Sequence, residues 1–142
     1  MTELPKREID IIIPCLNSAN TIERALDSLR KQTNQNFNIV LVDDGSTDGT
    51  GELATTYAHQ HKLTLRVITH EKNQGTSTAM NTGDRASAND WITLLGSDDE
   101  FDEKWLDTML KVKERVKGFN VYACTAYLVE PNGRRTHHKE GM

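Results

Sequence analysis

The sequence contains no apolar run long enough to cross a bilayer and too few cysteines for a disulfide framework. Its longest apolar runs, residues 11–13 and 39–42, are of strand size. The polar residues 1–8 include no hydrophobic core of a signal peptide. The two cysteines among 142 residues, Cys15 and Cys124, match no metal-binding or redox spacing. We therefore expect a cytoplasmic protein with reduced thiols and no transmembrane segment, and association with the inner face of a membrane stays open.

The charge balance and two missing glycine motifs argue against three further classes of protein. Lys and Arg number 17 and Asp and Glu number 21, so the formal net charge is −4 and no basic stripe suggests a nucleic-acid partner. No Gly-x-Gly-x-x-Gly follows the first expected strand, and no Gly-Lys-Thr or Gly-Lys-Ser loop occurs. These absences argue against dinucleotide-binding and P-loop proteins.

Apolar runs alternate along the chain with segments of helical period. Strands are expected at residues 9–13, 37–42, 63–69, 90–95 and 121–129. Helices are expected around residues 20–29, 53–61, 75–86 and 105–116. This alternation predicts an α/β, Rossmann-like fold, with a mostly parallel sheet and helices on both of its faces. Residues 1–142 are interpreted as a single domain in which residues 134–142 form a flexible tail.

Two adjacent carboxylates, Asp43 and Asp44, end the second expected strand just before a glycine turn. In open α/β sheets the carboxyl ends of the strands form the edge where ligands bind. The residues that follow, 45–50, also suit a plain turn and a helix cap. That simpler interpretation explains residues 45–50 but assigns no function to Asp43 and Asp44.

A second acidic segment ends the fourth expected strand, where Ser97 precedes Asp98 and Asp99. Paired carboxylates suit Mg²⁺ or Mn²⁺, which prefer oxygen ligands and often combine one or two protein carboxylates with substrate phosphates. Alternatively, either aspartate caps the next helix. Because both acidic segments are expected on one edge of the sheet, they favour a nucleotide ligand whose diphosphate is held by a divalent cation.

Four segments, taken in order, resemble family 2 glycosyltransferases. They are Ile-Ile-Ile-Pro-Cys-Leu-Asn at 11–17, Val-Asp-Asp-Gly-Ser-Thr-Asp-Gly-Thr at 42–50, Asn-Gln-Gly at 73–75 with Asn81 and Gly83, and Gly-Ser-Asp-Asp at 96–99. The resemblance covers about residues 9–110 and implies an inverting transferase of the GT-A fold. It further implies a nucleotide-diphosphate sugar donor, a UDP-sugar, and a glycan, lipid or protein acceptor in cell-surface polysaccharide or glycoconjugate synthesis.

The resemblance assigns a nucleobase pocket to the first two strand ends. Pro14 and Leu16 would line it, and Asn17 would shape the loop. Leu16 stands where an aromatic residue is common, so flatter apolar contact would replace stacking. Asp44 would accept a hydrogen bond from a uracil-type imide. Asp43 would support this site by buttressing the turn, or alternatively it only caps the turn and has no role in binding.

The resemblance also places Asn73 and Gly75 near the ribose and phosphates of the donor. At Gly75 the lack of a side chain would allow close backbone approach. The family often has an arginine where this chain has Met80, so one cationic contact is expected to be missing.

The cation motif departs from the family pattern at Gly96, where the family has its first carboxylate, often a contact to ribose. Asp98 matches the carboxylate that ligates the metal, and Asp99 is interpreted as a supporting or alternate ligand beside Ser97. Cation binding is therefore expected, whereas recognition of the ribose would lack one carboxylate partner.

No residue of the sequence is recognised as the catalytic base that an inverting transferase needs. Glu130 and Glu140 are the only carboxylates after Gly118, and both are interpreted as surface residues. Two hypotheses stay open. The chain is the N-terminal, donor-binding portion of a glycosyltransferase, or it is a non-catalytic domain that binds nucleotide-sugars.

Overall fold

The computed structural model of the chain describes residues 3–122, 124 and 127–137. It divides into two compact units, Met1–Asp107 and Thr108–Met142. The division follows from burial, because Leu106 is the one fully covered residue of helix α4 (Trp105–Arg115) and the strands that follow expose their apolar side chains. No helix in the described part of the chain has both the length and the apolar character that a bilayer crossing requires.

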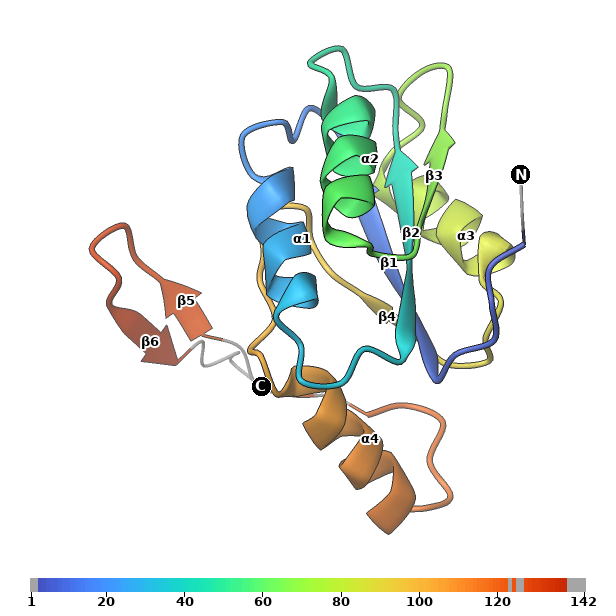
Figure 1. The fold of residues 1–142 in the computed structure, drawn as a ribbon, viewed down its shortest axis with the longest axis vertical. Helices are drawn as coiled ribbons and strands as arrows, with labels where there is room; N and C mark the ends of the chain where they lie inside the picture. The colour runs from blue at the N-terminus through green and yellow to red at the C-terminus, as the bar shows by residue number, and fades with distance from the viewer. Residues whose placement is uncertain (1–2, 123, 125–126, 138–142) are drawn as a thin grey trace. The chain divides into compact units, whose positions relative to one another are not determined.

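The first unit is built on a parallel sheet, as the sequence predicts, with four strands in place of the five expected (Figure 1). Its strands are β1 (Ile9–Cys15), β2 (Phe37–Asp43), β3 (Leu65–Thr69) and β4 (Ile92–Leu94), in the order β3-β2-β1-β4. The two central strands are almost entirely buried because both of their faces are covered, which explains their continuous apolar sequences. The carboxyl ends of all four strands consequently lie at one edge.

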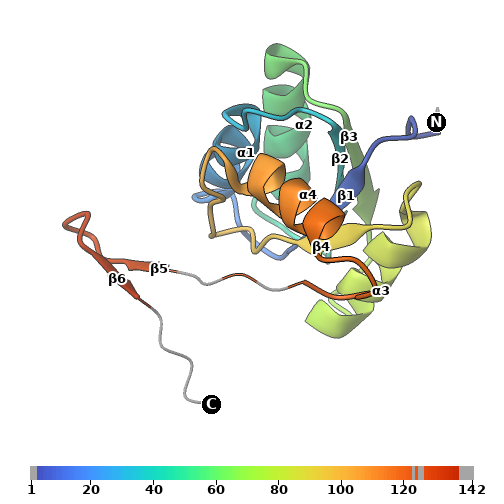
Figure 2. The ribbon, with the colours of Figure 1, turned by 90° about the horizontal axis from the view of Figure 1, so that it is seen from below.

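Helices cover both faces of this sheet, again as predicted (Figures 1 and 2). On one face lie α1 (Ile22–Arg30) and α2 (Thr50–His61), and on the other lies α3 (Thr76–Ala86). Under α3 the buried core includes Ile12, Val40, Val42 and Ala79. Gly83 of α3 approaches Ile12 so closely that a Cβ atom there would overlap the isoleucine side chain.

The strands outside this core differ most from the sequence prediction. Strand β4 has three residues instead of six, and among the described residues it is an edge strand that pairs with β1 alone. The predicted strand 121–129 is reduced to β5 (Tyr127–Val129), which pairs in an antiparallel hairpin with β6 (Arg135–His137). A strand therefore occupies part of the segment expected to be a flexible tail, and the rest of that tail, residues 138–142, lies outside the described residues.

A buried carboxylate, Asp10, anchors the end of the sheet opposite to the acidic edge. Its side chain is 0% exposed, and its Oδ1 accepts hydrogen bonds from Asn38 Nδ2 and Asn89 Nδ2, both at 2.8 Å. Its Oδ2 accepts from the backbone N–H groups of Ala88 and Asn89. One side chain thereby ties β1 to β2 and to the segment that enters β4.

Candidate functional site

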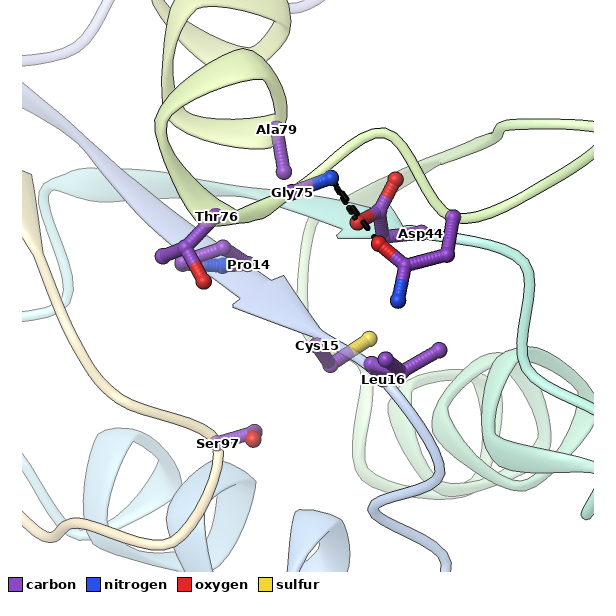
Figure 3. A pocket seen from close by; sticks show the side chains of 9 residues that line it. Pro14, Cys15, Leu16, Asp44, Gly75, Thr76, Ala79 and Ser97 are labelled. Atoms are coloured by element: carbon purple, nitrogen blue, oxygen red, sulfur yellow. Dashed lines mark hydrogen bonds between the residues drawn. The ribbon is translucent and has the colours of Figure 1, made fainter.

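A pocket of about 290 Å³ opens at the carboxyl edge of the sheet (Figure 3). Residues from the ends of β1 and β2, the start of α3 and the loop after β4 line it, namely Pro14, Cys15, Leu16, Asp44, Asn73, Gly75, Thr76, Ala79 and Ser97. In Figure 3 the end of β1 runs between Asp44 and Gly75 on one side and Ser97 on the other. Six of the sequence-predicted residues are thus brought together: Pro14, Leu16, Asp44, Asn73, Gly75 and Ser97.

Asp44 is the buried carboxylate of this pocket, with 4% of its surface exposed. Its Oδ1 accepts a hydrogen bond from the backbone N–H of Gln74 at 2.9 Å and lies 2.7 Å from His70 Nδ1. Its Oδ2 accepts from the N–H of Gly75 at 2.9 Å, a donor shared with Asn73 Oδ1. Asp44 therefore fixes the loop between β3 and α3 while remaining part of the pocket wall.

The same contacts keep the Asp44 carboxylate ionised. Burial by itself would raise its pKa, but the hydrogen bonds from His70 and from the backbone of Gln74 and Gly75 outweigh burial. The pKa of Asp44 consequently lies below its ordinary value. The pocket thus presents a fixed negative acceptor at neutral pH.

The loops after β2 and β3 meet at Gly45. Its φ of +87° is in the left-handed region, and a Cβ atom there would lie 2.9 Å from the backbone nitrogen of Asn73. Only glycine combines this conformation with such a close backbone approach. The Asp-Gly turn that the sequence displays therefore allows Asp44 to reach the 73–75 loop.

Asn17 and Asp43 do not line the pocket but organise the turns beside it. Asp43, itself buried, accepts a hydrogen bond at Oδ1 from the N–H of Ser46 at 2.9 Å. Asn17 has a φ of 49° and accepts at Oδ1 from the N–H of Thr47 at 2.8 Å. Its own N–H donates to Ser46 Oγ at 2.9 Å. These contacts join the loop after β1 to the loop after β2.

Asp98 and Asp99 lie exposed on the loop after β4, next to the lining residue Ser97. Both carboxylates gather beside Gly96, where a Cβ atom would lie 3.2 Å from Asp98 Oδ1 and would overlap Asp99 Oδ2. Within the described residues no group of three or more His, Cys, Asp or Glu side chains could by itself hold a metal ion. Two carboxylates beside a side-chain-free position nevertheless fit Mg²⁺ or Mn²⁺ when substrate phosphates complete the coordination.

The loop after β4 is held by contacts with α1 and with the loop that precedes α1. Arg24 donates from its guanidinium to the carbonyl oxygen of Asp98 at 2.9 Å, and its Nε lies 3.4 Å from Glu100 Oε2. Ser18 Oγ and Ser97 Oγ are 2.7 Å apart and share a hydrogen bond. The two aspartates are therefore carried by a loop whose backbone is fixed.

The thiol of Cys15 lines the pocket but is expected to be unreactive in the folded protein. Its pKa is raised to about 12 by burial and then by three carboxylates, those of Asp43, Asp48 and Asp44. Because the thiolate is the reactive species, iodoacetamide at about pH 8 should modify the exposed Cys124 and spare Cys15 until the chain is unfolded in urea. Mass spectrometry of the labelled peptides measures this, and equal labelling of both native cysteines would contradict it.

His70 is the main site residue that sequence reasoning misses. It follows β3 directly, at the edge where ligands bind, yet no motif marks it. Besides its contact with Asp44, its Nε2 lies 3.0 Å from Thr82 Oγ1 of α3. Its position one residue after a predicted strand is the signal that could have identified it.

Solved structures similar to this chain include S. aureus TarS and a mannosyltransferase. S. aureus TarS 1–349 in complex with UDP-GlcNAc matches with a TM-score of 0.69 and 28% identity, covering 82% of this chain and 37% of that one. The mannosyltransferase PcManGT from Pyrobaculum calidifontis, in complex with GDP-Man and Mn²⁺, matches with a TM-score of 0.64 and 27% identity, covering 68% and 29%. The chain has the α/β fold of GT-A transferases, as its sequence predicts.

The sequence comparison narrows this class to one family. A family model described as glycosyl transferase family 2 matches residues 10–141, and the chain belongs to that family. The PGL/p-HBAD biosynthesis glycosyltransferase of Mycobacterium tuberculosis is 42% identical over 103 residues, which are 72% of this chain and 39% of the relative. The chain spans well under half the length of the curated relatives it matches.

Proposed function

We propose that this chain binds the donor of an inverting glycosyl transfer, a UDP-sugar, together with Mn²⁺ or Mg²⁺. The acceptor is a glycan, lipid or protein in cell-surface polysaccharide or glycoconjugate synthesis. The observation that carries the proposal is the Asp44 carboxylate, which is held ionised in the wall of the pocket and, among the described residues, has one acceptor position unfilled. Family membership and the nucleotide-sugar complexes of TarS and PcManGT support it.

The acceptor positions of Asp44 favour uracil over guanine. A carboxylate oxygen accepts about two hydrogen bonds. Oδ1 has both positions filled, by His70 and Gln74, whereas within the described residues Oδ2 accepts only from Gly75. Uracil offers one imide N–H and therefore needs one position. Guanine offers adjacent N–H and NH₂ donors, which a carboxylate satisfies best with both oxygens.

The diphosphate of the donor would lie between the start of α3 and the loop after β4. Thr76 lines the pocket at the first turn of α3, where backbone N–H groups and the helix dipole favour negative charge. Asp98, with Asp99 as a supporting ligand, would hold the divalent cation. The bound cation would neutralise charge that develops on the leaving diphosphate.

A non-catalytic nucleotide-sugar-binding domain is the second candidate. It is favoured by Gly96, which stands where the family has a carboxylate, and by Met80, which stands where an arginine is common. The pocket and Asp44 would serve such a domain equally well. Detecting sugar transfer or donor hydrolysis by the 142-residue chain would exclude this candidate.

Calorimetry with UDP in the presence and absence of Mn²⁺ tests the proposed function. The wild-type chain should bind UDP more tightly with Mn²⁺, and Asp98→Ala should lose roughly tenfold in affinity with the cation present, because one charged ligand is removed. Asp84→Ala, an exposed aspartate on α3, serves as the matched control and should behave like wild type. Binding that is equal for all variants and independent of Mn²⁺ would rule out the assigned cation site.

A further inference from the structure

We propose that His70 is a positioning residue that makes the pocket selective for uracil by occupying one oxygen of Asp44. The inference rests on the proposed function and concerns the same site. His70 does not line the pocket, so it would act on the nucleotide only through Asp44. None of the motifs that assign the pocket residues includes it.

The ring of His70 is held at both of its nitrogens. Nδ1 lies 2.7 Å from Asp44 Oδ1, at the end of β2, and Nε2 lies 3.0 Å from Thr82 Oγ1, on α3. The backbone N–H of His70 donates to the carbonyl oxygen of Asp43 at 2.8 Å. With 10% of its side chain exposed, His70 is a fixed bridge between the sheet and the helix.

This bridge makes the two oxygens of Asp44 unequal. With the ring in place, Oδ1 meets two partners and Oδ2 meets one. Without the ring, each oxygen would keep a single backbone donor, from Gln74 or Gly75. Asp44 would then offer an acceptor position on both oxygens, which is the arrangement that guanine requires.

Two substitutions of His70 separate the contact with Asp44 from the contact with Thr82. His70→Asn places an amide nitrogen near the position of Nδ1 and retains a donor to Asp44. His70→Gln places its amide nitrogen near the position of Nε2 and leaves Oδ1 without its second partner. A residue that only fills space would respond alike to both changes.

Calorimetry with UDP and with GDP, in the presence of Mn²⁺, is the test. His70→Gln should weaken UDP binding about tenfold and reduce the preference for UDP over GDP by a similar factor, because the hydrogen bond between His70 and the Asp44 carboxylate is removed. His70→Asn should keep the wild-type preference. The control His59→Gln changes an exposed histidine of α2 and should match wild type.

An unchanged preference in His70→Gln, or equal effects of the two His70 variants, overturns the inference. If His70→Gln does not fold, Thr82→Val and His70→Asn decide, because both lose the contact with Thr82 Oγ1 and retain a donor to Asp44 Oδ1. A wild-type preference for UDP in both variants supports the inference, and a reduced preference in either overturns it. A wild-type chain that binds neither nucleotide overturns the proposed function as well, whereas selective UDP binding unaffected by His70 overturns this inference alone.

Discussion

Replacing Asp44 by alanine should weaken UDP binding roughly 100-fold, because a hydrogen bond to a charged group contributes about 1.5–3 kcal/mol and the loop beside it loses its anchor. The truncation removes the Asp44 acceptor from the N–H of Gln74 and leaves the N–H of Gly75 with Asn73 Oδ1. Calorimetry with UDP and Mn²⁺ measures the affinity. Circular dichroism confirms that the variant is folded.

The control for this variant is Glu71→Ala, which removes an exposed carboxylate from the same loop. It should bind UDP like wild type. If Asp44→Ala also binds UDP like wild type, Asp44 is not part of the nucleotide site.

The stability lost in Asp44→Ala should also depend on pH. Since folding lowers the pKa of Asp44, its contribution is complete above the ordinary value of 3.8 and disappears as pH falls through the lowered folded value.

The largest loss of stability is expected from Asp10→Ala, at about 3–5 kcal/mol. Four hydrogen-bond donors meet at this fully buried carboxylate, and each buried donor left without a partner costs roughly 1–3 kcal/mol, partly recovered by relaxation. Urea unfolding followed by circular dichroism measures the free energy of unfolding.

Asp90→Ala is the matched control for Asp10→Ala. This aspartate is exposed on the connection to β4, and its replacement should change the free energy of unfolding by less than about 0.5 kcal/mol. Comparable losses in the two variants would show that the buried network around Asp10 contributes little to stability.

The central part of the fold is predictable because strands that are covered on both faces have nearly continuous apolar sequences. The apolar runs of β1 and β2 indicate covered parallel strands, and the helical periods between strands place α1, α2 and α3. The edge strand β4 and the hairpin β5–β6 leave weaker traces. Their residues are exposed, so the apolar pattern there does not report where pairing begins and ends.

The site is predictable where residues follow strand ends and is not where contacts cross between elements. Pro14, Asp44 and Ser97 each stand at or just after a strand and meet in one pocket. The contact of His70 with Asp44 spans 26 positions of sequence and depends on the relative placement of β2, β3 and α3. No local pattern encodes such a contact, and the same holds for the bond between Ser18 and Ser97.

That serine pair connects the loop after β1 with the loop after β4, and these two strands are neighbours in the sheet order β3-β2-β1-β4. Asp44 and His70, which are proposed to set the base preference, follow β2 and β3, whereas the residues proposed to hold the cation follow β4. The proposed base preference and the proposed cation site therefore depend on separate stretches of the chain. Under these proposed roles, substitutions after β2 and β3 would change the nucleotide preference without altering the loop that holds the cation.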